Sequence, residues 1–411
     1  MENRRRVVVV GMGIRSPISN TLGEFVKSLK ERRSGICMMP EWENIHRLRT
    51  RVAGLCNIEG QEELIPRQYR RSMGRVALLA ALSAIDAVKA SGLTEEEIAS
   101  PTSGVSYGST EGSTKSQMEY IGNMIQKRSL EGIPASWYLK CMSHTCAGNL
   151  SVLFHTRGPF IASCPACVSG SQGIGFGYEA IKAGKADIMI TGGADEADVL
   201  SAAVFDLMMA TSSNYNDRPS ETPRPFDANR DGLVVAEGAA TLILEEYERA
   251  KNRGAEILGE IQGFWTNGSG VHLTNSDARS MEECMLAALK DARCNPAEIQ
   301  HVNAHATGTT HGDDVEAIAI NKIYGPDVPT TSIKGYMGHT MGACGAIEAI
   351  ATLLMMREGF IASTLNLESP DPALPPLNHV MGETRDQRFS LAVSNNFAFG
   401  GVNTSLVLSS V

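Results

Sequence analysis

Short apolar segments that end in glycine alternate with longer stretches of helical periodicity along most of the chain. RVVVVGMG near the N-terminus and the segment at 186–196 are continuous apolar runs, as expected for strands buried on both faces. The stretch at 74–92 predicts a helix closed by Gly92, since glycine commonly follows the last turn of a helix. This alternation predicts an α/β fold with parallel sheets.

The alternation restarts after a strand and a charged helix at 241–255, which divides the chain into two halves. No linker rich in Pro, Ser or Gly lies there, so we expect the halves, 1–252 and 253–411, to pack as one body. The second half predicts a strand in EILGEIQGFW, a helix in SMEECMLAALKDARC, strands in IQHVNAH and VPTTSIKG, a helix in MGACGAIEAIATLLMMREG and a closing hairpin in FSLAVSNNFAFGGVNTSLVLSS.

Composition excludes several classes of protein. A hydrophobic content of 43% with 20% charged residues excludes a disordered chain, and a net charge of −9 argues against binding to nucleic acid. No apolar run approaches the roughly 20 residues needed to span a membrane. The nine cysteines are irregularly spaced, which points to a reducing compartment and not to a disulfide framework. We therefore expect a cytoplasmic protein without a nucleic-acid or membrane partner.

Basic residues are concentrated between residues 24 and 75. This stretch holds eleven Lys and Arg against seven acids, although the whole chain is acidic. A solvated surface is the ordinary explanation. The alternative is a docking patch for a small acidic partner.

The stretch PACVSGSQGIGFG places Cys167 between a predicted strand, GPFIASC, and a predicted helix that ends at Gly184. Unpaired N–H groups and the partial positive charge at a helix N-terminus favour a thiolate and can bind an oxyanion. Cys167 is therefore a nucleophile, a redox partner of Cys164, or a buried structural thiol. The CPAC spacing suits a redox dithiol, but it lies in the middle of a large chain, so redox chemistry is the lesser alternative.

Two histidines follow predicted strands in similar settings. His305 lies in VNAHATGTTHGDD and His339 in SIKGYMGHTMGACG. The carboxyl ends of parallel strands meet at one edge of a sheet, so both side chains are candidates for a shared site with the cysteine. A metal site made from His301, His305, His311 and Asp313 is an alternative, but these residues lack a standard ligand spacing.

Together these segments resemble the elongating beta-ketoacyl-[acyl-carrier-protein] synthases, condensing enzymes of the thiolase superfamily. The resemblance covers nearly the whole chain, through VVVVGMGIRSP, RGPFIASCPACVSG, RPFDANRDGLVVAEGAATLILEEYERAKNRGA, VNAHATGTTHGD, KGYMGHTMGACGAIEA and SNNFAFGGVN. It implies a five-layered αβαβα fold with two similar halves, normally dimeric. It also implies an acidic acyl carrier protein as partner, which gives the basic stretch at 24–75 a function.

The implied reaction is a decarboxylative Claisen condensation of a malonyl unit with an acyl chain held on the enzyme. Both substrates are carried on the phosphopantetheine of the carrier protein, and no metal or other cofactor is implied. By resemblance, Cys167 accepts the acyl chain, and His305 and His339 support decarboxylation. Phe399 resembles a gating phenylalanine whose backbone N–H completes an oxyanion hole with that of Cys167.

Five further residues match positions around the site of this family. Lys334 and Glu348 match a lysine and a glutamate that order the site. Thr307 and Thr309 resemble threonines that hold the pantetheine arm, and Asp313 matches a structural residue nearby.

The sequence also separates this chain from its relatives. Thiolases carry a second catalytic cysteine near the C-terminus, and no cysteine follows Cys344 here. Initiating synthases have asparagine where this chain has His339, and non-catalytic chain-length partners lack the cysteine found here at Cys167. An elongating synthase is therefore predicted, with a partner or chain-length subunit of a heterodimer as the alternative.

Glu111, in SYGSTEGSTKS, departs from the family pattern. Fatty-acid elongating members usually place an apolar residue there, at the far end of the acyl pocket. A buried carboxylate must be paired or solvated. The structural explanation is a salt bridge at a dimer interface. The functional alternative is an acyl chain with a polar end, such as an aryl polyene or polyketide intermediate.

Overall fold

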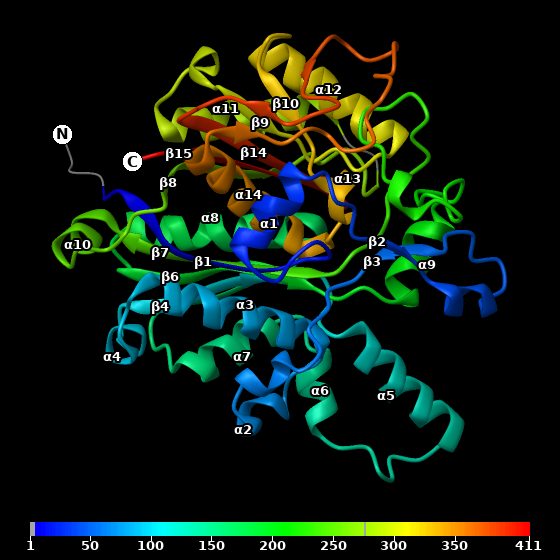
Figure 1. Cartoon of the computed structure of the whole chain (residues 1–411). Helices are drawn as coiled ribbons and strands as arrows, with labels where there is room; N and C mark the ends of the chain where they lie inside the picture. Colours follow the sequence, from blue (N-terminus) through cyan, green and yellow to red (C-terminus); the bar gives the residue numbers. More distant parts are fainter. Residues whose placement is uncertain (1–4, 275–276) are drawn as a thin grey trace.

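The computed structural model describes residues 5–274 and 277–411 of the chain. Its main sheet has eleven strands in the order β12-β10-β9-β14-β15-β8-β1-β7-β6-β4-β5. The sheet is folded into two layers, because β8 pairs with β1 through two residue pairs where the layers meet. Figure 1 shows five layers, with helices above, between and below the two sheet layers. The five-layered α/β prediction is therefore confirmed.

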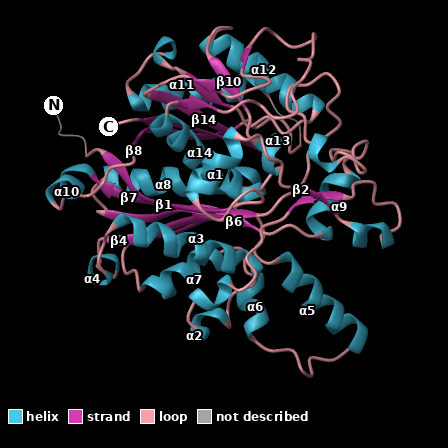
Figure 2. Ribbon diagram, viewed as in Figure 1, coloured by secondary structure: helices cyan, strands magenta, loops and turns pink. Residues whose placement is uncertain are grey.

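The first half forms one sheet layer. β5, β4 and β6 run parallel, whereas β7 runs antiparallel to both β6 and β1. In Figure 2 the helices α3 and α7 lie below these strands, and α8 lies above them. The bounds of these elements are β1 Val7–Arg15, β4 Ser103–Gly108, β5 Phe160–Ser163, β6 Ile188–Asp195, β7 Gly238–Glu246, α3 Arg75–Ser91, α7 Thr145–Phe154 and α8 Ser169–Lys182.

The second half repeats this arrangement. β10, β9 and β14 run parallel, whereas β15 runs antiparallel to both β14 and β8. Helices α11 and α12 lie on the outer side, and α14 lies between the layers beside α8 (Figure 1). The bounds are β8 Gly259–Gly268, β9 His301–Asn303, β10 Pro329–Thr331, β14 Leu391–Ala398, β15 Val402–Ser409, α11 Ala278–Ala292, α12 Thr310–Tyr324, α13 Lys334–Met337 and α14 Cys344–Glu358.

Shorter elements surround this core. The predicted boundary after residue 252 falls between α10 and β8. No helix among residues 5–274 and 277–411 is long and apolar enough to cross a membrane. The remaining bounds are α1 Leu22–Lys30, β2 Ile36–Met38, β3 Val52–Gly54, α2 Arg67–Arg70, α4 Glu95–Ile98, α5 Thr114–Lys127, α6 Ser136–Cys141, α9 Val199–Leu207, α10 Tyr247–Asn252, β11 Phe360–Ile361, β12 Asn378–His379 and β13 Arg385–Asp386.

The prediction of parallel sheets is only partly correct. Parallel pairs join three strands of one layer (β5, β4 and β6) and four of the other (β12, β10, β9 and β14), but β7, β1, β15 and β8 make antiparallel pairs. A continuous apolar run shows that a strand is buried on both faces. It does not show the direction of its neighbours. In contrast, α3 ends as predicted, with Gly92 in the left-handed conformation at φ 65°.

The two central helices bring the site together. α14 is buried along nearly its whole length, as its almost uniformly apolar sequence predicts. A 3₁₀ turn precedes each helix, and each turn holds a non-glycine residue at positive φ, Ala166 at 52° and Met341 at 46°. Such conformations are strained and are held by the surrounding structure. These two turns lie in contact where the halves meet, one of them carrying Cys167.

Candidate active site

A cavity of about 420 Å³ opens between the two halves. Apolar side chains such as Phe205 of α9 and Met281 of α11 line part of its wall. All six residues that the sequence predicts at the reaction or pantetheine positions line the same cavity: Cys167, His305, Thr307, Thr309, His339 and Phe399.

Cys167 lies in the 3₁₀ turn ahead of α8 and is 6% exposed. Its Sγ is 2.9 Å from Nε2 of His339. Burial raises the pKa of the thiol to about 12, although the Lys334 ammonium opposes this effect. The expectation that a helix N-terminus favours the thiolate is therefore wrong for the resting site, because desolvation outweighs the dipole. Cys167 is a thiol at neutral pH, with His339 placed to take its proton.

His305 and His339 lie side by side in the cavity. Their ring centroids are 5.2 Å apart and their planes are nearly perpendicular, at 89°. Burial lowers the pKa of both imidazoles well below the ordinary value of 6.5, and the Lys334 ammonium lowers it further. Both rings are therefore neutral at physiological pH. A neutral imidazole can donate one N–H and accept one proton.

Lys334 and Glu348 form an ion pair directly behind the histidines, and both side chains are almost fully buried. Burial lowers the pKa of Lys334, but the Glu348 carboxylate outweighs it and raises that pKa above its ordinary value. Lys334 Nζ is also 3.3 Å from Nδ1 of His305. The ammonium thus lies against both the carboxylate and the imidazole.

The structure does not assemble the histidine-rich metal site considered from the sequence. His301 lies on β9 with Nε2 2.9 Å from the Thr331 hydroxyl. Among the residues with described positions, the ligand atoms close enough together to hold a metal belong to His305, Cys344 and Glu348, within 4.8 Å of one another. Because Lys334 contacts two of these three, its ammonium already supplies the positive charge there.

Two carboxylates on α12 hold the loop that carries His305 and Thr307. Asp313 accepts hydrogen bonds from the backbone N–H of Thr307 at 3.0 Å and from that of Phe226 at 2.8 Å. Glu316 accepts from the backbone N–H of His305 at 2.7 Å. Sequence reasoning identified Asp313 but missed Glu316. The signal was present, because residues three apart on a helix share a face.

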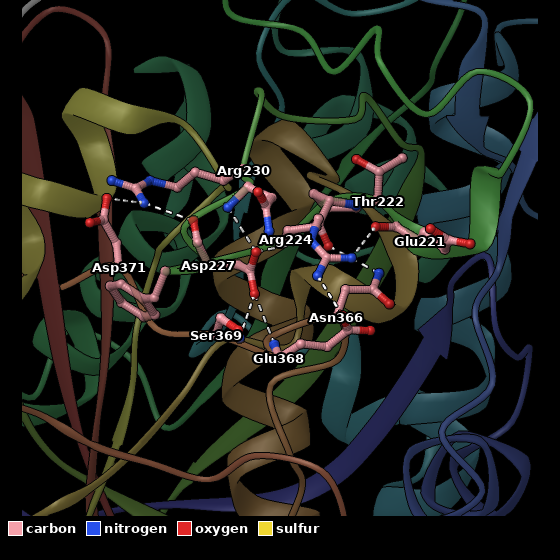
Figure 3. Close-up of polar contacts among 12 residues, drawn as sticks. Glu221, Thr222, Arg224, Asp227, Arg230, Asn366, Glu368, Ser369 and Asp371 are labelled. Carbon is pink, nitrogen blue, oxygen red and sulfur yellow. Dashed lines mark hydrogen bonds and ion pairs between the residues drawn. The ribbon is translucent and has the colours of Figure 1, made fainter.

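A buried polar network joins the segment around Asp227 to a distant part of the chain (Figure 3). The Asp227 carboxylate accepts from Arg224 Nε at 3.2 Å and from the backbone N–H groups of residues 368–369 at 2.9 Å each. Arg230 donates to Asp371 at 2.8 Å. Since Asp313 also holds Phe226 in this segment, the network fixes the segment against the loop that lines the cavity.

Phe399 follows β14 and lies in the cavity wall. Its ring packs against Phe205 of α9, with centroids 5.7 Å apart. The turn after it needs two residues at positive φ, Gly400 at 87° and Gly401 at 69°, a conformation that glycine adopts without strain. The predicted gating residue is therefore on a glycine turn beside the nucleophile.

Two models of known protein families match most of this chain. The family model of the beta-ketoacyl synthase N-terminal domain matches residues 4–250, and that of the C-terminal domain matches residues 258–368. The chain belongs to the beta-ketoacyl synthase family. It is therefore a condensing acyltransferase with a thiolase-like fold, as the sequence resemblance implied.

Named relatives of this synthase are similar over their full length. The 3-oxoacyl-[acyl-carrier-protein] synthase 1 of Haemophilus influenzae is 35% identical, and that of Escherichia coli K12 is 34% identical, each match covering 98% of both chains. A crystal structure of a beta-ketoacyl synthase from Burkholderia phymatum is 43% identical, with a TM-score of 0.96 over 99% of this chain and all of that one.

A polyketide-type neighbour is more distant in sequence. It is a ketosynthase in complex with a type II polyketide synthase acyl-carrier protein, 27% identical with a TM-score of 0.90 over the whole of both chains. This synthase is thus similar both to proteins named 3-oxoacyl-[acyl-carrier-protein] synthase and to a ketosynthase of a type II polyketide synthase.

Glu111 and Cys164 lie apart from the cavity of the synthase. Glu111 is in an exposed loop ahead of α5 and does not line the cavity. Partial burial and the Asp198 carboxylate raise the pKa of Glu111. Cys164 is exposed, and it forms no disulfide with the buried Cys167.

The state of the Cys167 thiol predicts how alkylation depends on pH. Because burial raises its pKa to about 12, the thiolate fraction rises with pH over the whole accessible range. We expect the rate of iodoacetamide alkylation to rise about tenfold per pH unit between about pH 6 and about pH 9. Peptide mass spectrometry of a Cys164→Ser variant measures this rate at Cys167. A plateau below about pH 8 would show that the resting residue is a thiolate.

Proposed function

We propose that this synthase elongates acyl chains bound to an acyl carrier protein, with Cys167 as the nucleophile and malonyl-carrier as the two-carbon donor. One observation carries the proposal. The Cys167 thiol lies 2.9 Å from neutral His339 in a cavity that also holds neutral His305. A nucleophile beside a base, with a second neutral hydrogen-bond donor in the same cavity, suits both half-reactions of a condensation.

In the first half-reaction, Cys167 exchanges one thioester for another. The thiol proton moves to His339 Nε2 as sulfur attacks the acyl carbonyl. The backbone N–H groups of Cys167 and Phe399 would hold the oxyanion. Collapse forms the Cys167 thioester, and the carrier thiol leaves with the proton. No metal or nucleotide is needed for this exchange.

In the second half-reaction, malonyl-carrier loses CO₂. The electrons of the breaking carbon–carbon bond form an enolate, whose oxygen accepts hydrogen bonds from the imidazole N–H groups of His305 and His339. His339 donates from Nε2 in this step, with its ring proton on that nitrogen, because the acylated Cys167 no longer presents a thiol proton to it. The enolate carbon attacks the Cys167 thioester and displaces the sulfur as a thiolate. This thiolate takes up a proton from solvent, because the original thiol proton left with the first carrier thiol. The product is a 3-oxoacyl chain on the carrier, two carbons longer than the acyl chain on Cys167.

The carrier protein and a second synthase-like chain are the proposed partners. Among the relatives, one ketosynthase is in complex with an acyl-carrier protein, and another is a ketosynthase/chain length factor. Two surface features support a second chain here. β5 is an edge strand of the main sheet, which can pair with another strand, and Ile125, Leu130 and Tyr138 of the α5–α6 region are 65%, 67% and 72% exposed.

Part of the basic stretch at 24–75 supports carrier docking. Arg33 and Arg51 are occupied in ion pairs with nearby glutamates, as the solvated-surface explanation requires. Arg67 and Arg71, at the two ends of α2, are exposed. These arginines suit an acidic partner, since complementary surface charge steers association.

Intact-protein mass spectrometry with a panel of acyl-carrier thioesters tests the proposed function. We expect a covalent acyl adduct that maps to the Cys167 peptide. Preference for saturated chains would place the synthase in fatty-acid elongation, whereas preference for aryl-unsaturated chains would favour the aryl-polyene or polyketide alternative. Native spectra of the same samples give the number of chains in the assembly. The absence of an adduct with any donor would favour the partner-subunit alternative.

The Glu111→Ile variant tests the polar-end hypothesis in the same experiment. Among residues 5–274 and 277–411, Glu111 forms no ion pair, and the nearby Asp198 carboxylate raises its pKa further. If Glu111 recognises the end of the acyl chain, the variant changes the preference within the panel. An unchanged preference would leave Glu111 as a surface residue.

A further inference from the structure

Asn396 on β14 is fully buried and lies between the Glu348 carboxylate and the His305 imidazole. Its Nδ2 donates to Oε2 of Glu348 at 2.6 Å. The same nitrogen is 3.3 Å from Nδ1 of His305 and 3.7 Å from Sγ of Cys344. Sequence reasoning gave this asparagine no function, although it falls within the SNNFAFGGVN segment.

The orientation of the Asn396 amide follows from its closest partner. A carboxylate accepts hydrogen bonds and donates none, so the group that lies 2.6 Å from Glu348 must be the NH₂ and not the oxygen. Burial raises the pKa of Glu348, but the Lys334 ammonium and the Asn396 amide oppose this effect, and the ion pair with Lys334 keeps the carboxylate as an acceptor. The second N–H of the amide then points between His305 Nδ1 and the Cys344 sulfur.

Two obligate donors therefore meet one nitrogen of His305. Lys334 Nζ and Asn396 Nδ2 are each 3.3 Å from Nδ1, and neither nitrogen has an acceptor to offer. Nδ1 must present its lone pair, which places the ring proton on Nε2. In a neutral imidazole this tautomer leaves Nε2 as the donor, and an Nδ1–H tautomer would leave Nε2 as an acceptor.

We propose that Asn396 is a positioning residue that fixes His305 in the Nε2–H tautomer and thereby sets the rate of malonyl decarboxylation. This inference rests on the proposed role of His305. An enolate oxygen is stabilised by a donor and repelled by a lone pair, so only the Nε2–H tautomer supports the step. Asn396 also holds Glu348, which otherwise competes with His305 for the N–H groups of Lys334.

Two variants of Asn396 separate the effect of the tautomer from a general effect on folding. Asn396→Ala removes one of the two donors, so we expect malonyl-carrier decarboxylation to fall about tenfold. Transfer of an acyl group to Cys167 should change less than about twofold, because His339, not His305, contacts the sulfur. Asn396→Asp places an acceptor beside His305 Nδ1, so we expect the ring proton of His305 to move to Nδ1. The rate of decarboxylation should then fall further than in Asn396→Ala.

Asn149 provides the matched control. It is also buried, and its Nδ2 donates to the Thr145 carbonyl at 2.8 Å, in the outer helix α7. Asn149→Ala therefore removes a comparable amide without touching the catalytic network. We expect it to lower thermal stability while leaving the ratio of decarboxylation to acyl transfer unchanged.

Nitrogen NMR of histidine-labelled protein gives a readout that does not depend on turnover. The His305 signals, assigned by their loss in His305→Ala, should show a protonated Nε2 in the wild type and a protonated Nδ1 in Asn396→Asp. Equal losses of both half-reactions in Asn396→Ala, or an unchanged tautomer in Asn396→Asp, would overturn the inference. If the wild type forms no acyl adduct and releases no CO₂, the proposed function fails, and the NMR result still decides the tautomer.

Discussion

Cys167→Ala is expected to abolish condensation, with a loss of at least about 10⁴-fold in turnover. The variant removes the sulfur proposed to form the acyl-enzyme bond, and among the described residues that line the cavity Cys167 alone carries a thiol. Malonyl decarboxylation should persist, because His305 and His339 are untouched and the malonyl unit still binds beside them. Separate assays of 3-oxoacyl product and of CO₂ release check both parts of this prediction.

Cys164→Ser is the control for this result. Cys164 is three residues away, exposed, and free of any disulfide. We expect the serine variant to keep full condensing activity. Equal losses in the two variants would support a redox pair and contradict the nucleophile. Cys167→Ser should behave like the alanine variant, since a serine hydroxyl is far harder to ionise than a thiol.

Lys334→Met is expected to destabilise the fold and to stop decarboxylation. The ammonium and the Glu348 carboxylate are 1% and 2% exposed. Removal of one partner from such a buried pair leaves an uncompensated charge and costs about 3–5 kcal/mol of unfolding free energy. The charged one of the two donors to His305 Nδ1 is lost as well, so we expect decarboxylation to fall by at least about 100-fold. Chemical denaturation and CO₂ release measure the two effects.

The double variant Lys334→Met/Glu348→Gln separates stability from catalysis. With both charges removed, we expect most of the lost unfolding free energy to return, while decarboxylation stays low because Lys334 is still absent. Lys30→Met provides a surface comparison. Lys30 and its partner Glu358 are 43% and 52% exposed, so we expect a change within about 1 kcal/mol. If the double variant were as unstable as Lys334→Met, the loss of unfolding free energy in the single variant would come from packing and not from the unpaired charge.

The sequence predicted much of this architecture from local patterns. Strand β1, helix α3 with its Gly92 end, and the closing hairpin of β14 and β15 all follow from apolar periodicity and from glycine. Local patterns are sufficient here because they set the backbone conformation within a few residues. They also placed His305 and His339 after strands, which brings them to one cavity.

Residues that act through buried contacts were less visible. Glu316 was missed although it lies three residues after Asp313 on the same helix face, and Asn396 was missed because it belongs to no spacing pattern tied to a reaction. Each residue reaches the site through a contact that folding makes. Asn396, for example, contacts Glu348, which is 48 residues away in the chain. Glu111 stays a prediction: its motif position suggests the far end of an acyl pocket, and the residue does not line the cavity of the single chain.

The sequence by itself predicted the layered α/β class and the family, and it singled out Cys167, His305 and His339, which line one cavity. Only the tertiary structure shows the mixed strand directions and the burial that raises the pKa of Cys167, and only its contacts lead to the proposed tautomer of His305. The physical reason is the range of the forces involved. Backbone conformation depends on neighbours in the chain, whereas desolvation and hydrogen bonding depend on which groups folding brings together.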